Sequence, residues 1–133
     1  MTLHELSQLY WLRREIREDE QRLHRLRLLA ESVPSPNNDG MPRSSEVNSR
    51  VERVAVELVE LEGLIAEKYA KSVSERLRLE RWIAAIPDSL TRQVFTARFV
   101  EGLRWDEVAE YIGGGISASG VKKICYRYLD GRD

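Results

Sequence analysis

The sequence has few of the residue types on which many protein chemistries depend. Its 133 residues include one cysteine and two histidines, so no internal disulfide forms and no zinc-ligand spacing occurs. No apolar run approaches the roughly 18 residues of a membrane-spanning helix. The start, Met-Thr-Leu-His-Glu, lacks the basic and apolar stretches of a signal peptide. We therefore expect a cytoplasmic protein with no membrane segment, metal or cofactor.

Neither positive nor negative charge predominates in the chain. Charged residues make up 32% of the chain, but the net charge is only −1. This balance excludes a non-specific polyanion binder, so any nucleic-acid surface must be a local patch. The C-terminal part has segregated charges, because Asp106, Glu107 and Glu110 precede a glycine run, whereas Lys122, Lys123 and Arg127 follow it.

The sequence offers little support for an enzyme. The carboxylates lie on amphipathic helical faces, with no pair placed for acid–base catalysis. Cys125 has no nearby histidine and acid to activate it, so we expect a packed or half-exposed thiol. We predict that the protein performs no catalysis.

Residues 1–31 form the first predicted segment, with one long amphipathic helix from residue 2. Its apolar residues follow heptad spacing, with Asp19 as the one polar interruption. A breaker-rich linker follows over 32–45. The stripe consists of Leu9, Leu12, Ile16, Leu23, Leu26 and Ala30.

Residues 46–86 form a second long helix, which Pro87 ends. Its heptad stripe would next place Lys68, Ser72 and Glu75 in the core, whereas apolar residues continue at Tyr69, Val73 and Leu77. Because Ser72-Val-Ser-Glu75 also matches a capping box, a stutter or break is predicted near 72–74. The stripe consists of Val47, Val51, Val54, Leu58, Leu61 and Ile65.

The two stripes can pair in two ways. They form an antiparallel hairpin within one chain, which the linker permits, or they pair between chains in a homodimer. Asp19 at a core position argues against an uninterrupted two-stranded coil. A polar residue at such a position can instead fix the register in which two helices pair. We favour a hairpin that also contributes to self-association as a homodimer.

Three short helices are predicted within residues 87–133. Because no stretch of the sequence alternates polar and apolar residues with period two for long, the whole chain is predicted to be all-α. Gly102 is placed to end the first of these helices and Gly113 the second, in conformations that favour glycine. The three predicted stripes are Leu90, Val94, Phe95 and Phe99; Trp105, Val108, Ala109 and Ile112; and Val121, Ile124, Tyr128 and Leu129.

The segment from Val100 to Ile124 has the pattern of a helix-turn-helix, in which one helix braces and the next enters the major groove of DNA. Ser117 is a good N-cap for the second helix, which runs to Leu129. Its outer face carries side chains that hold phosphates or read base edges. The candidate DNA-binding residues are Arg104, Ser117, Ser119, Lys122, Lys123, Tyr126 and Arg127.

The stretch from Ile86 to Gly113, with its Arg-Phe-Val-Glu-Gly-Leu and Glu-Val-Ala-Glu-Tyr-Ile-Gly runs, resembles the start of region four of bacterial sigma factors. Ile116-Ser-Ala-Ser-Gly-Val-Lys-Lys is similar to its recognition-helix entry. The whole chain resembles phage-encoded regulators of the ArpU/RinA type, to whose interhelical segment Asp39-Gly-Met-Pro-Arg43 is similar. The resemblance implies a regulator of phage or prophage genes in a bacterial host cell, which binds double-stranded DNA and has RNA polymerase as a further partner.

Two features depart from the sigma pattern. Gly114 and Gly115 lengthen the turn, and Ala118 and Gly120 stand where large reading residues are common. These departures shift the expected base contacts to Ser119, Lys122, Lys123 and Arg127. The alternative function is a helical interaction or assembly protein, an adaptor or small-terminase-like subunit, that acts through the N-terminal helices.

Overall fold

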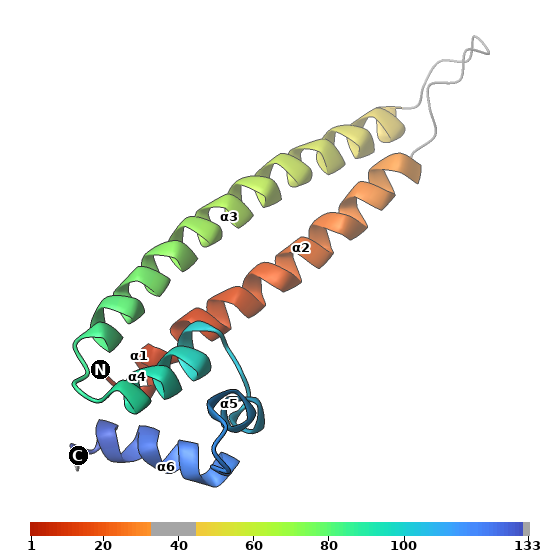
Figure 1. Cartoon of the computed structure of the whole chain (residues 1–133). Helices are drawn as coiled ribbons and strands as arrows, with labels where there is room; N and C mark the ends of the chain where they lie inside the picture. The colour runs from red at the N-terminus through yellow and green to blue at the C-terminus, as the bar shows by residue number, and fades with distance from the viewer. Residues whose placement is uncertain (33–44, 132–133) are drawn as a thin grey trace. The chain divides into compact units, whose positions relative to one another are not determined.

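The described part of the chain consists of helices joined by short non-helical segments (Figure 1). The computed structural model describes residues 1–32 and 45–131, and within them it contains no strand, which confirms the all-α prediction. No helix in these ranges is both long and apolar enough to cross a membrane. The elements are α1 (Leu3–Leu6), α2 (Gln8–Ser32), α3 (Ser45–Ala84), α4 (Ser89–Phe95), a π-helical turn η1 (Thr96–Val100), α5 (Trp105–Ile112) and α6 (Ala118–Leu129).

The chain divides into two compact units. Unit 1 consists of Met1–Arg13 and Lys71–Asp133, and unit 2 consists of Arg14–Ala70. Helices α2 and α3 each contribute to both units. The predicted linker core over 33–44, including the segment from Asp39 to Arg43, lies outside the described residues, as does the side chain of Val47.

Unit 2 is an antiparallel pairing of α2 with α3 within one chain. Leu23 packs against Leu61 and Ile65, and all three side chains are buried. Two ion pairs fix the direction, since Asp19 contacts Lys68 at 2.6 Å and Arg27 contacts Glu62 at 3.2 Å. The residue numbers rise along one helix as they fall along the other. The heptad stripe predicted for α2 is therefore confirmed as its packed face.

The predicted break near 72–74 does not occur, because α3 is continuous from Ser45 to Ala84. Lys68, Ser72 and Glu75 stay on the half-buried face, whereas Tyr69 and Val73 are exposed. The polar side chains remain there because they find partners. Lys68 pairs with Asp19, and Glu75 accepts a hydrogen bond from Arg78 at 3.1 Å. The helix therefore keeps its register.

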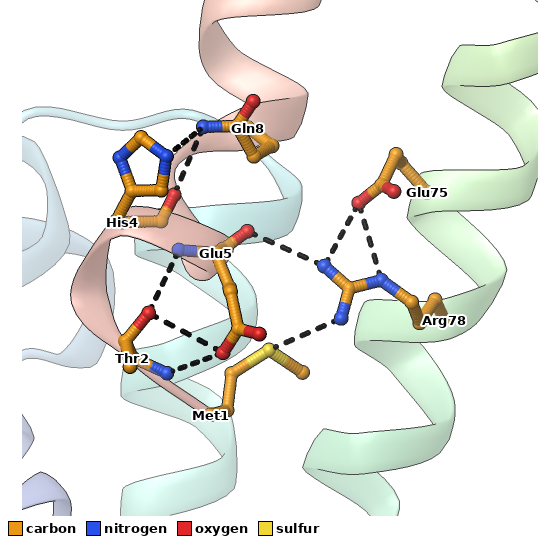
Figure 2. A network of polar contacts seen from close by, with 7 residues as sticks. All are labelled: Met1, Thr2, His4, Glu5, Gln8, Glu75 and Arg78. Atoms are coloured by element: carbon orange, nitrogen blue, oxygen red, sulfur yellow. Dashed lines mark hydrogen bonds and ion pairs between the residues drawn. The ribbon is translucent and has the colours of Figure 1, made fainter.

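The first predicted helix is interrupted once, at Ser7, between α1 and α2. Thr2 caps α1 by a reciprocal capping box, in which its Oγ1 accepts from the Glu5 amide and the Glu5 carboxylate accepts from the Thr2 amide. Figure 2 shows that Arg78 of α3 reaches across to α1, where it donates to the Glu5 carbonyl at 3.5 Å and contacts the Met1 sulfur. These contacts fasten the start of the chain into unit 1.

The core of unit 1 draws on more than the predicted 87–133 segment. Leu6 and Leu9 from the N-terminal helices are fully buried in it, together with Leu79 and Ile83 of α3. Arg13 also donates to the Val100 carbonyl at the end of η1. The C-terminal helices therefore depend on residues from the start of the chain and the end of α3.

Helix α4 begins at Ser89, and the residues buried in its first turn differ from the predicted stripe. Asp88 is its N-cap and accepts hydrogen bonds from the Thr91 amide at 3.0 Å and hydroxyl at 2.7 Å. This phase buries Thr91 and leaves Leu90 37% exposed, so the prediction that Leu90 is buried is wrong. Val94, Phe95 and Phe99 are buried as predicted.

Candidate nucleic-acid interface

Helices α5 and α6 pack directly against each other across a short turn. Val108 of α5 and Val121 and Cys125 of α6 are fully buried in the core of unit 1. Ile112 and Ile116, on either side of the turn, are half-buried and pack against this core. These buried contacts hold one face of α6 against the core and leave its opposite face exposed to solvent.

Three consecutive glycines make the turn. Gly113, Gly114 and Gly115 have φ values of 73°, 68° and 79°, all in the left-handed region that side-chain-bearing residues rarely adopt. A Cβ at any of them would meet no atom within 4 Å. The glycines are therefore required by backbone conformation and not by space. The predicted positive φ at Gly113, and at Gly102 before α5, is confirmed.

The start of α6 follows the predicted capping pattern. Ser117 is the N-cap, and its Oγ accepts a hydrogen bond from the Gly120 amide at 3.0 Å. Gly120 is half-buried, and a Cβ there would lie 3.0 Å from Cγ2 of Ile116. Gly120 thus allows the turn to approach the helix closely, which explains a small residue where a large one was expected.

The exposed face of α6 is basic. Ser119, Lys122, Lys123 and Arg127 are all exposed, as the helical pattern predicted. Three of the four are cations, and Lys123 and Arg127 form no ion pair with another described residue. Their charge is therefore available to a partner.

Tyr126 differs from its predicted state, because it is half-buried and not exposed. Its ring centroid lies 6.4 Å from that of Trp105, and the Lys122 ammonium lies 5.8 Å from its centroid. The sequence periodicity placed Tyr126 on the outer face but gave no sign that Trp105 covers it. Tyr126 therefore supports Lys122 more than it offers a free surface.

Arg104 makes more polar contacts within the chain than the other candidate DNA-binding residues. Its Nε lies 3.3 Å from Asp106 and 3.4 Å from Glu107, and its amide donates to the Glu107 carboxylate at 3.0 Å. The hydrogen bond with Arg104 lowers the pKa of the Asp106 carboxyl. Arg104 thus stabilises the first turn of α5, and its charge is offset locally.

Arg98 is a supporting residue that the sequence analysis missed. It donates to the Leu103 carbonyl at 2.8 Å, and its guanidinium lies 4.7 Å from the ring centroid of Trp105. It therefore fixes the loop that leads from η1 into α5. The only signal in the sequence was that Arg98 directly precedes the aromatic Phe99.

Tyr111 is a second missed residue. It is 67% exposed near the end of α5, beside the glycine turn. Its hydroxyl is a donor at the edge of the exposed surface. The apolar stripe of α5 predicts an outward position for this residue, but the sequence gave no reason to select it.

The cysteine of α6 is buried beneath this surface. Burial raises the pKa of the Cys125 thiol to about 12, so it stays neutral and unreactive inside the core. Across residues 1–32 and 45–131, no three histidine, cysteine or acidic side chains gather in a group that could hold a metal ion. The surface presents three cations and a serine on one helix.

No protein-family model, no curated protein and no solved structure matches this chain.

Proposed function

We propose that α5, the glycine turn and α6 form a helix-turn-helix that binds double-stranded DNA, with α6 in the major groove. The observation that carries the proposal is the exposed basic face of α6, formed by Lys122, Lys123 and Arg127. A helix with one face packed on a bracing helix and the other face cationic suits the width of the major groove.

The charges around this face support the proposal. Two acids of α5, Asp106 and Glu107, are held close to Arg104 at the start of that helix, whereas the third, Glu110, is exposed before the turn. The cations of α6 lie beyond the turn, where Lys123 and Arg127 face solvent. Because DNA is a dense polyanion, such a segregated patch binds it even in a chain of net charge −1.

The resemblance to region four of sigma factors and to phage regulators of the ArpU/RinA type gives the proposal its biological setting. We infer that the protein regulates transcription of phage or prophage genes. RNA polymerase is a further proposed partner, on the same resemblance. The three-glycine turn distinguishes this chain from the sigma pattern, so we do not carry over the promoter sequence.

The test is selection from a pool of duplex DNA with a randomised core, followed by anisotropy measurements on the enriched duplex. We expect enrichment of one sequence, and competition by unlabelled duplex of that sequence but not by an unrelated duplex. Failure to enrich any sequence, with equal weak binding to all duplexes, would overturn sequence-specific regulation.

A second candidate function is assembly through the helices of unit 2. It is favoured by apolar side chains on α3 that face solvent, with Val56 55% and Val59 71% exposed. A protein that self-associates but binds no duplex would favour this alternative.

A further inference from the structure

Two cations and two aromatic rings form a row that leads from η1 to the exposed face of α6. The Arg98 guanidinium lies 4.7 Å from the ring centroid of Trp105, and the Trp105 centroid lies 6.4 Å from that of Tyr126. The Lys122 ammonium lies 5.8 Å from the Tyr126 centroid. All three distances fall in the ranges at which cations and rings, or two rings, attract each other. We call these four residues the Lys122 row.

The row is anchored at its buried end and charged at its exposed end. Arg98 donates to the Leu103 carbonyl at 2.8 Å, which fixes the guanidinium against Trp105. Lys122 is exposed and forms no ion pair with another described residue, and α6 contains no acid. The contact with the half-buried Tyr126 ring, one turn further along α6, therefore orients the Lys122 ammonium.

Position around α6 separates Lys122 from the other exposed cations. Val121 and Cys125 are fully buried and mark the side of the helix that faces the core. Because each residue turns the helix by about 100°, Lys123 lies opposite this buried pair, and Arg127 lies about 40° from Lys123. Lys122 lies about 100° from Lys123, on the other side, and therefore at the border of the exposed face.

Central and border side chains of a helix in the major groove meet different parts of the DNA. Central side chains reach base edges, whereas border side chains face the phosphates that flank the groove. Lys122 is placed for a phosphate, with which a lysine ammonium pairs as a point charge. A side chain that is already held in place also loses less freedom on binding. The central residues left to read bases are Ser119, Lys123 and Arg127.

We propose that Trp105 and Tyr126 are positioning residues, which hold Lys122 at the border of α6 so that its ammonium contacts a backbone phosphate and not a base. The inference rests on the proposed DNA-binding function. It gives Trp105, on the bracing helix α5, a part in DNA binding that it performs through Tyr126. It also separates Lys122 from the base contacts expected from the sequence.

The row is tested first in the free protein, by proton–carbon correlation spectra. An aromatic ring shifts the resonances of protons that lie over it, so the ε-methylene protons of Lys122 should resonate upfield of those of Lys123. Tyr126→Leu should remove this shift and Tyr126→Phe should keep it. Trp105→Leu should reduce it, because the Tyr126 ring then loses its support. Equal shifts for the two lysines in wild type would overturn the proposal.

The phosphate contact is tested by a double-mutant cycle on the selected duplex across a salt series. Lys122→Ala should reduce the slope of log affinity against log salt by about one. It should weaken binding to the selected duplex and to a duplex with a scrambled core by the same factor, because a phosphate carries no sequence information. Tyr126→Leu should weaken binding about two- to fivefold, and should have no further effect once Lys122 is alanine.

Tyr128→Leu is the matched control for loss of a ring from α6. Tyr128 packs in the core against Trp82 and Phe95, with ring centroids 5.9 Å and 5.6 Å apart. Its removal should lower the melting temperature, which circular dichroism measures for every variant, but should leave the salt slope unchanged. Tyr126→Phe should bind as wild type does.

Two results would contradict the inference while the proposed function stands. Tyr126→Leu that weakens binding equally with and without Lys122 would show a purely structural role for the ring. Lys122→Ala that weakens binding to the selected duplex alone would show a base contact. Wild type that binds no duplex would overturn the proposed function and this inference together, and the methylene shifts would then show whether the Lys122 row itself is present.

Discussion

Asp19 and Lys68 form a 2.6 Å contact between Oδ2 and Nζ, although each is a polar residue that interrupts the apolar stripe of its own helix. Both side chains are largely shielded, with 17% and 20% exposed. The hydrogen bond that Lys68 donates to Asp19 raises the pKa of the Lys68 ammonium, so Lys68 stays protonated across the ordinary pH range. The two interruptions therefore specify one register of the hairpin.

Removing one partner of this pair should cost stability. We expect Lys68→Ala to lower the free energy of unfolding by about 1 kcal/mol, because it leaves the half-buried Asp19 carboxylate without its closest cation. Urea denaturation followed by circular dichroism measures the change. Asp19→Leu with Lys68→Leu should recover most of the loss, since apolar residues then continue both stripes.

The control for this pair is the exposed ion pair of Arg14 with Glu18 on α2. Glu18→Ala should change stability by only a few tenths of a kcal/mol. Equal losses from Glu18→Ala and Lys68→Ala would show that the shielded pair has no special role.

The glycine turn makes a second prediction. Gly114→Ala should destabilise the protein by about 1–2 kcal/mol, because alanine is strained at a φ of 68° although the site is open. Gly63→Ala is the matched control, since Gly63 lies within α3 and a Cβ there also meets nothing. It should stabilise by about 0.5–1 kcal/mol. Thermal melts of both variants measure these changes in stability. Changes of equal size and the same sign would contradict the role given to the left-handed backbone at Gly114.

Acid should weaken unit 1 through the cap of α4. Hydrogen bonds from Thr91 lower the pKa of the Asp88 carboxyl below its usual 3.8. A carboxyl shifted in this direction stabilises the fold above pH 3.8, and that contribution is lost as the pH falls through the lowered value.

Asp88→Asn keeps the cap but cannot titrate, so its melting temperature should fall less than that of wild type between pH 5 and about pH 2. Asp130→Asn, at the end of α6, serves as a control and should follow wild type. An identical acid response of Asp88→Asn and wild type would rule out this role for Asp88.

Cys125 should be protected from thiol reagents. Burial holds its thiol neutral, with a pKa of about 12, so labelling at pH 8 should be much slower in the folded protein than in urea. Mass spectrometry after iodoacetamide treatment measures the ratio. Equal labelling rates would mean that α6 does not pack as described.

Much of the fold follows from sequence periodicity. The stripe through Leu9, Ile16 and Leu23, the cap at Ser117 and the positive φ at Gly113 were all predictable, because each depends on local residue chemistry. The continuity of α3 was not, because Lys68 and Ser72 look like a register failure until Asp19 is placed opposite.

Tertiary contacts account for the other differences. Nothing local in the sequence indicated that Leu6 and Leu9 belong to the core of unit 1, since their partners lie at the other end of the chain. Likewise, Trp105 packs against Tyr126, and Asp106 forms an ion pair with Arg104. Helical periodicity alone does not predict either contact. The candidate interface was therefore predicted in position but not in the state of every side chain.

The central claim is that the basic face of α6 binds DNA, and the salt dependence of binding tests it most directly. The measurement is the affinity for the selected duplex across a salt series, for wild type, Lys123→Ala, Arg127→Ala and the control Arg17→Ala. For wild type we predict a steep fall of log affinity with log salt. Replacing a residue that contacts a base should cost about 1–3 kcal/mol of binding free energy. Replacing a residue that contacts a phosphate should reduce the salt slope by about one. Arg17→Ala should match wild type. Binding that is unchanged in both α6 variants, in affinity and in slope, would contradict the account.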